Sequence, residues 1–170
     1  MASSESKNTA KRRKIILIMA IVAAALAVIA VIFFNSVMSS ESSHNISRFF
    51  SRLILPFVDT GAEWTDRSVA DTIVRKIAHA VIYCALAVIL TCFTLMLRGR
   101  ARGIGYVISS VGILCVASAD EFIQHYSGRG ASVTDVAIDM SGAAAGMLTV
   151  SLIYLLIQKI KKMRKNNKIR

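Results

Sequence analysis

Four long apolar runs constrain this chain more than any other feature of its sequence. They cover about residues 15–34, 77–97, 104–124 and 135–158. A helix of about 20 residues, rising about 1.5 Å per residue, crosses a hydrocarbon core about 30 Å thick. The whole chain is 55% hydrophobic and contains a single proline, a composition too apolar for an ordinary soluble domain. We therefore predict an all-α fold, a polytopic bundle of four transmembrane helices in the cell membrane.

Basic residues next to these runs indicate how the helices are oriented. Clusters of lysine and arginine lie in residues 11–14, 98–102 and 159–165. Tails and short loops rich in these residues stay in the cytoplasm. Both termini, residues 1–14 and 159–170, are therefore predicted to be cytoplasmic tails, in contact with anionic lipid at that face. The net charge of +11 does not predict a nucleic-acid partner, because the basic residues are not interleaved with aromatic ones.

The first apolar run has a second interpretation, as a signal peptide, but its length argues against this. A cleaved signal has an apolar core of about 7 to 15 residues, followed by a small-residue cleavage site. This run is longer and ends in Phe33-Phe34-Asn35. We predict an uncleaved first span, followed by an extracytoplasmic loop over residues 35–75.

The long polar loop contains an amphipathic pattern. Serine and arginine lie on one helical face, and the opposite face carries Ile46, Phe49, Phe50, Leu53, Ile54 and Phe57. This spacing predicts a helix over residues 45–58. We place it in the outer membrane interface, and packing over the spans is an alternative of equal weight.

Ionisable residues gather at the outer ends of the last three spans. His79 opens the second span, Asp120 and Glu121 close the third, and Asp135 and Asp139 open the fourth. An ionised side chain in bilayer hydrocarbon costs about 3 kcal/mol on insertion scales. Residues of this kind mark a candidate functional site.

Helical spacing places these groups on shared faces. Lys76, His79 and Tyr83 are spaced i, i+3 and i+7, and Gln124 follows the acid pair by three and four positions. On the fourth span, a single stripe contains Asp135, Asp139, Gly142 and Gly146. The glycines let a neighbouring helix approach closely on the face that carries the acids. We therefore expect the acids to face the bundle interior, near the basic groups Lys76, His79 and Arg129.

Each residue also has a purely structural interpretation. His79 alone fits an interfacial histidine, Tyr83 fits an interface aromatic, and Asp135 fits the N-cap of the fourth helix. Glycines four positions apart are typical of helix packing. All these residues occur at one depth, on three helices. This coincidence favours a functional site over the separate structural interpretations.

The ordered pattern of these residues resembles the VanZ-like family of bacterial membrane proteins, the teicoplanin-resistance protein family. The resemblance covers about Lys76 to Met147 and is carried by Lys76-x-x-His79-x-x-x-Tyr83, Asp120-Glu121-x-x-Gln124, Arg129, Asp135 and Gly142-x-x-x-Gly146. The namesake of that family lowers susceptibility to teicoplanin, a glycopeptide antibiotic, and such antibiotics act on cell-wall precursors outside the membrane. The resemblance therefore fits an outward-facing polar site, but it implies no particular reaction.

One position departs from the family pattern. Asp139 stands where the family usually has asparagine, four residues after Asp135. A carboxylate in place of an amide removes two hydrogen-bond donors and adds a charge. Either a cation or Arg129 compensates for this charge, or Asp139 is protonated.

Three functions fit such a site. The first is an enzyme that acts by acid–base chemistry on a membrane lipid or lipid-linked envelope precursor, and its predicted catalytic residues are His79, Glu121, Asp120 and Tyr83. Its predicted substrate-binding residues are Lys76, Gln124, Arg129, Asp135 and Asp139. The second is a non-catalytic ligand-binding or envelope-stress protein. The third is a small proton-coupled transporter, which four spans without a midplane charge favour least.

The sequence predicts no cofactor. The alternative is a divalent metal bound by His79 together with aspartate and glutamate side chains. Cys84, Cys92 and Cys115 lie inside apolar runs, so they predict neither a disulfide framework nor a cysteine metal site. The sequence does not indicate an oligomeric state.

Overall fold

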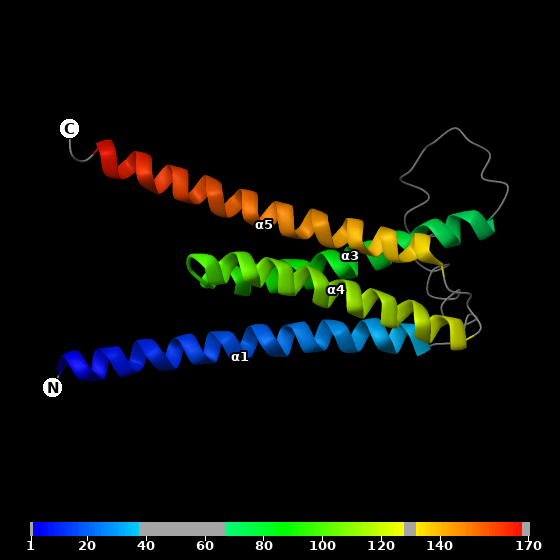
Figure 1. Cartoon of the computed structure of the whole chain (residues 1–170), viewed down its shortest axis with the longest axis horizontal. Coiled ribbons are helices and arrows are strands. Elements are labelled where there is room, and N and C mark those ends of the chain that lie inside the picture. The colour runs from blue at the N-terminus through cyan, green and yellow to red at the C-terminus, as the bar shows by residue number, and fades with distance from the viewer. Residues whose placement is uncertain (1, 38–66, 128–131, 168–170) are drawn as a thin grey trace.

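The computed structural model describes residues 2–37, 67–127 and 132–167. These residues form helices and no strand (Figure 1), and the helices are α1 Ala2–Val37, α3 Arg67–Met96, α4 Arg100–Tyr126 and α5 Val133–Asn167. Each contains a segment long and apolar enough to cross a membrane: Asn8–Val37, Thr72–Met96, Arg100–Tyr126 and Val133–Asn167. The predicted all-helical fold with four membrane-spanning helices is confirmed. The amphipathic helix predicted for residues 45–58 lies outside the described residues.

The helices extend beyond the apolar runs that predict them. α1 already begins at Ala2 and passes through the basic residues 11–14, and α5 continues through the second basic cluster to Asn167. α4 begins at Arg100, four residues before the predicted start of its span. Lysine and arginine are good helix formers, and no glycine or proline interrupts residues 2–14 or 159–167. Hydrophobicity therefore predicts the span, whereas local helix propensity determines where the helix ends.

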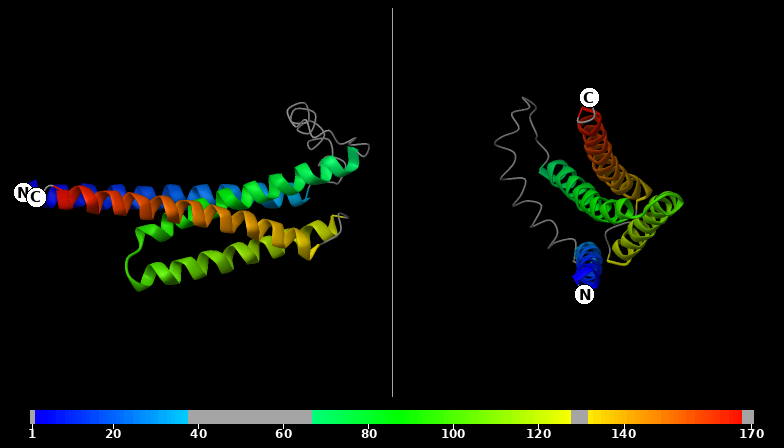
Figure 2. Two further views of the ribbon diagram at one scale, coloured as in Figure 1. Left: turned by 90° about the horizontal axis from the view of Figure 1, so that it is seen from above. Right: turned by 90° about the vertical axis from the view of Figure 1, so that its left-hand side faces the viewer.

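The chain termini and the polar residues lie at opposite ends of the bundle. The start of α1 and the end of α5 lie at the same end of the bundle, on opposite sides of it (Figures 1 and 2). The opposite end, here called the polar end, contains the end of α1, the start of α3, the end of α4 and the start of α5. α3 packs against all three other helices, and its contact with α5 is the most extensive. The polar end is thus the place where four helix ends meet.

A tight turn connects α3 to α4 near the end that carries the termini. Gly99 has a φ of 57°, a left-handed conformation that glycine adopts without strain. The Arg102 guanidinium donates hydrogen bonds to the carbonyls of Leu97, at 3.1 Å, and Leu95, at 3.3 Å. It also lies 5.1 Å from the centre of the Tyr154 ring on α5. A basic residue in the first turn of α4 thus satisfies carbonyl groups at the end of α3.

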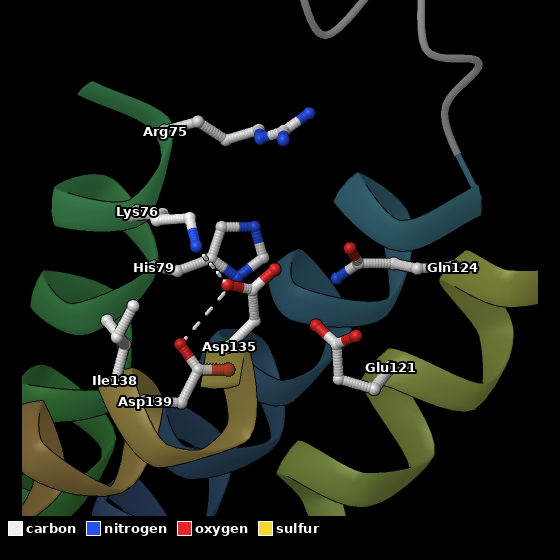
Figure 3. A pocket seen from close by; sticks show the side chains of 8 residues that line it. All are labelled: Arg75, Lys76, His79, Glu121, Gln124, Asp135, Ile138 and Asp139. Atoms are coloured by element: carbon white, nitrogen blue, oxygen red, sulfur yellow. Dashed lines mark hydrogen bonds and ion pairs between the residues drawn. The ribbon is translucent and has the colours of Figure 1, made fainter. Parts of the chain in front are cut away.

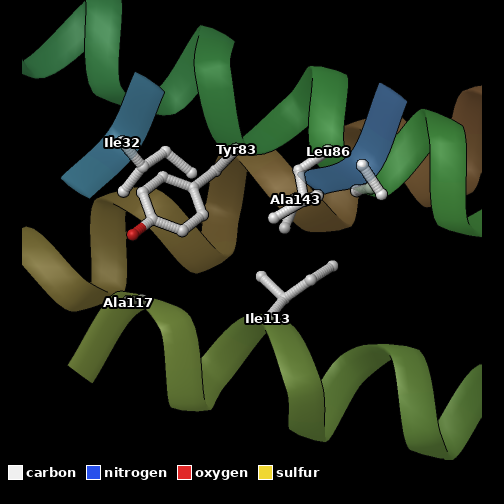
Figure 4. Close-up of a cluster of buried hydrophobic side chains, with 8 residues drawn as sticks. Ile32, Tyr83, Leu86, Ile113, Ala117 and Ala143 are labelled. Atoms are coloured by element: carbon white, nitrogen blue, oxygen red, sulfur yellow. The ribbon is translucent and has the colours of Figure 1, made fainter. Parts of the chain in front are cut away.

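The interior of the bundle is narrow and its outer surface is apolar. The buried apolar residues, shown in Figure 4, are Ala25, Ile32, Tyr83, Leu86, Ala87, Ile113, Ala117 and Ala143. Large apolar side chains such as Val81, Val107 and Leu148 are exposed on the outer faces. This distribution suits a lipid environment. Lipid tails are as apolar as these side chains, so no hydrophobic force drives the side chains into the interior.

Two glycines bring α5 into backbone contact with α3. A Cβ atom added at Gly142 would meet the backbone of Ala80, 2.8 Å from both its Cα and its carbonyl carbon. A Cβ atom at Gly146 would lie 2.5 Å from the carbonyl oxygen of Cys84. Real Cβ atoms essentially never approach another atom this closely. We call this contact of Gly142 and Gly146 with α3 the glycine seam.

Candidate functional site

Asp120 is the centre of a hydrogen-bonded cluster at the polar end. This α4 side chain is completely buried. Its Oδ1 atom accepts a hydrogen bond from the Ser36 hydroxyl of α1. Its Oδ2 atom accepts one from the Tyr83 hydroxyl of α3 at 3.2 Å and lies 3.6 Å from His79 Nδ1. One carboxylate therefore joins three helices.

A second buried carboxylate, Asp139 of α5, faces the same histidine. Its Oδ1 atom lies 3.9 Å from His79 Nδ1, and the side chain is 1% exposed. Within the described part of the chain, neither carboxylate oxygen has a hydrogen-bond partner. Burial of such a group is strongly unfavourable unless a cation or a proton neutralises it. His79 thus lies between carboxylates from α4 and α5.

Basic residues lie nearer the end of the bundle than this buried cluster. Lys76 Nζ and Asp135 Oδ1 are 2.6 Å apart, and their side chains are 35% and 28% exposed. Arg75 extends across the same opening (Figure 3). The polar end therefore has a basic, partly exposed rim and an acidic, buried floor.

Glu121 and Gln124 of α4 form the third side of the opening. Glu121 Oε2 accepts a hydrogen bond of 2.9 Å from the backbone N–H of Ser132, just before α5 begins. Gln124 is 7% exposed, and its amide nitrogen has no acceptor among the described residues. Figure 3 shows this amide directed toward the centre of the opening. The site thus offers an unused donor beside its acids.

These side chains enclose a small cavity. Its lining comes from α3, α4 and α5 and consists of Arg75, Lys76, His79, Glu121, Gln124, Asp135, Ile138 and Asp139. The cavity has a volume of about 20 Å³, enough for one water-sized group. A larger ligand would fit only at the rim, with one atom or small group inserted.

The sequence-predicted site residues that the structure describes all lie at the polar end. They are His79, Glu121, Asp120, Tyr83, Lys76, Gln124, Asp135 and Asp139. Arg129 lies outside the described residues, so its position relative to the cavity is not defined. Gly142 and Gly146 lie in the glycine seam, one turn and two turns deeper along α5 than Asp139.

Sequence reasoning missed two residues of this region, Ser36 and Arg75. Ser36 reaches Asp120 from α1, a helix that carries none of the predicted site residues. Ser36 is one of the first polar residues after the first apolar run. Its depth in the membrane therefore matches that of the predicted site and could have identified it. Arg75 lines the cavity and precedes His79 by four positions, the spacing of one helical face.

The buried cluster has the composition of both a proton-transfer site and a metal site. One ligand atom each from His79, Asp120 and Asp139 lies within 4.8 Å of the other two. An imidazole between carboxylates, next to a hydrogen-bonded phenol, provides groups that accept and donate protons. The same imidazole and carboxylates are ligands of divalent transition metals.

Comparison with known proteins identifies the family. The family model described as VanZ/LLP1 matches residues 20–156, a wider range than Lys76 to Met147, because it also includes most of the first span. Ser36 therefore lies within the family domain together with every described cavity residue. No curated protein and no solved structure matches the chain significantly. The chain belongs to the VanZ/LLP1 family of membrane proteins.

Proposed function

We propose that this protein binds the anionic group of a membrane lipid or lipid-linked envelope precursor at the outer membrane boundary, and carries out acid–base chemistry on it. A change in susceptibility to glycopeptide antibiotics follows if that molecule contributes to the cell wall. The observation that carries the proposal is the arrangement of a basic rim over a buried His79, Asp120 and Asp139 floor.

The outward orientation rests on the distribution of charge. Both basic helix extensions, before the apolar part of α1 and after that of α5, lie at the end opposite the cavity. Basic segments of this kind remain in the cytoplasm. The polar end then faces outward, toward the leaflet in which envelope precursors are used. The basic extensions then contact anionic lipid at the inner face.

Each group in the site has a role in this proposal. Lys76 and Arg75 attract a phosphate or carboxylate, and the Gln124 amide donates to one of its oxygens. His79 or Glu121 acts as the general base. Tyr83 and Asp120 hold the imidazole in place and share the proton that it receives. Because the cavity admits one water-sized group, the bulk of the substrate stays in the membrane interface.

A non-catalytic ligand-binding or envelope-stress protein is the second candidate. It is favoured by Asp120, whose contacts join α1, α3 and α4 and so also serve to hold the bundle together. In this case the protein binds its lipid without converting it. The wild-type protein then changes antibiotic susceptibility while every lipid and precursor species keeps its abundance.

The test compares substitutions of two histidines, each expressed in a host strain from which the gene for this protein has been deleted. His79→Ala removes the cavity imidazole, and His125→Ala removes an exposed one from the same bundle end. We expect the lipid and precursor profile and the teicoplanin susceptibility of the His79→Ala strain to equal those of the deletion strain. His125→Ala should behave as wild type. If His79→Ala inserts at the wild-type level and leaves both readouts as in wild type, the proposed function is wrong.

A further inference from the structure

We infer that His79, Asp120 and Asp139 bind one divalent transition-metal ion. Each residue comes from a different helix, α3, α4 and α5 respectively, and their ligand atoms lie within 4.8 Å of one another. His79 Nδ1 is 3.6 Å from Asp120 Oδ2 and 3.9 Å from Asp139 Oδ1. Ligand atoms about 2.1 Å from a tetrahedral ion are about 3.4 Å apart. The two distances to His79 exceed this value by a few tenths of an ångström, and the remaining pair, Asp120 and Asp139, lies within 4.8 Å, so side-chain movements bring this set to coordination distance.

Asp139 provides the first sign that a cation belongs here. The side chain is 1% exposed and directed at His79, but neither of its oxygens has a hydrogen-bond donor among the described residues. Asp120, by contrast, accepts hydrogen bonds from Ser36 and Tyr83. Lys76 is paired with Asp135 at the rim. Among the described basic side chains, only His79 lies within 4.0 Å of Asp139, so a metal ion would supply the charge that this carboxylate needs.

The Gln124 amide gives a second and independent sign of a ligand. This side chain is more than nine-tenths buried, lines the cavity, and has a nitrogen without an acceptor in the described part of the chain. A donor in this position requires an oxygen atom inside the cavity. A water molecule or phosphate oxygen bound to the metal is such an acceptor, and the volume of about 20 Å³ suits it.

The chemical types of the ligand atoms indicate which metal ions the site would bind. One imidazole and two carboxylates suit Zn²⁺, Mn²⁺ or Fe²⁺, whereas Mg²⁺ and Ca²⁺ prefer oxygen ligands alone. Tyr83 and Ser36 would orient the Asp120 ligand from behind through their hydrogen bonds. This inference takes up the divalent metal that the sequence analysis kept as the alternative to no cofactor.

The metal site concerns the same cavity as the proposed function, in which Glu121 is then the general base because the metal occupies His79 Nδ1, and it is tested without any assay of activity. The full-length protein is purified in lipid nanodiscs after removal of any affinity tag, stripped with a chelator, and dialysed against Mn²⁺ or Zn²⁺. Bound metal is then measured per chain. The matched variants are His79→Ala with His125→Ala, and Asp139→Asn with Asp135→Asn.

We expect about one ion per chain in the wild type and a loss of affinity of about 100-fold or more in His79→Ala and Asp139→Asn. His125→Ala and Asp135→Asn should bind as wild type. Tyr83→Phe, which keeps all three ligands, should weaken binding about tenfold. The electron paramagnetic resonance spectrum of bound Mn²⁺ should show coupling to one histidine nitrogen, which ¹⁵N-histidine labelling shifts.

Several results would overturn the metal site. Wild-type protein that binds no stoichiometric Mn²⁺ or Zn²⁺ contradicts it, as does a folded Asp139→Asn variant with wild-type affinity. If a ligand variant fails to fold, the wild-type spectrum decides, because bound Mn²⁺ without histidine coupling also contradicts the site. Metal binding without any effect of His79→Ala on lipids would leave the metal site intact and remove the proposed function.

Discussion

The two halves of one stripe on α5 differ in what they contribute to the protein. Gly142 and Gly146 form the deeper half, where backbone meets backbone and little space remains. Asp135 and Asp139 form the half at the polar end, where one acid is paired at the surface and the other is buried without a hydrogen bond to any described residue. The glycine half holds α5 on α3. The acidic half buries an ionisable group, which is unfavourable, and a protein keeps such a group for function.

The largest effect on stability is expected in the glycine half. Gly142→Ala places a methyl group against the backbone of Ala80, which cannot move aside as a side chain can. We expect a loss of about 3 kcal/mol in the free energy of unfolding, because α5 must move away from α3. Thermal unfolding in detergent measures this loss.

Gly112→Ala is the matched control. A Cβ atom at Gly112 of α4 would meet nothing within 4 Å. Its replacement should therefore leave stability unchanged or raise it by up to about 1 kcal/mol through helix propensity. Equal destabilisation by the two substitutions would show that the seam has no special role.

In the acidic half we expect a substitution to raise the free energy of unfolding, whereas Gly142→Ala lowers it. Asp139→Asn keeps the shape of the side chain, removes its charge, and adds two donors next to Asp120 and His79. In the presence of a chelator, the variant should be more stable than wild type by about 1 to 2 kcal/mol. The same variant should lose function. A less stable Asp139→Asn protein under these conditions would mean that the carboxylate contributes to the fold itself.

The smallest effect is expected at the rim. Lys76→Ala breaks the 2.6 Å ion pair with Asp135, but both side chains are partly exposed, so water replaces the lost contact. We expect a change of no more than about 0.5 kcal/mol in stability. Binding of an anionic lipid, measured by native mass spectrometry, should nevertheless weaken. A large loss of stability would show that the ion pair between Lys76 and Asp135 stabilises the fold.

Much of the fold and of the site follows from the sequence. Hydrophobic runs predict the four spans, and helical spacing predicts that Lys76, His79 and Tyr83 share a face. The acidic residues meet because the spans alternate in direction and place these residues at one depth. These inferences need only the period of the helix and the thickness of a bilayer.

Other features depend on tertiary contacts that spacing does not encode. The depth of Ser36 can be read from the sequence, but its contact with Asp120 cannot, because that contact depends on how α1 packs against α3 and α4. The difference in burial and pairing between Asp135 and Asp139 is likewise visible only in the structure. Both lie on one face, four residues apart, but one is paired at the rim and the other is buried without a donor in the described part of the chain. Burial, rather than spacing, separates a surface ion pair from a candidate metal ligand.

The most direct test of the central claim, that the buried acids serve function, uses Glu121→Gln. Glutamine keeps a side-chain oxygen to accept the Ser132 N–H hydrogen bond, removes the charge, and replaces the other oxygen with an NH₂ donor. The account predicts a melting temperature equal to that of wild type, together with the lipid and precursor profile and teicoplanin susceptibility of the deletion strain. A folded Glu121→Gln protein with wild-type profile and susceptibility would contradict it.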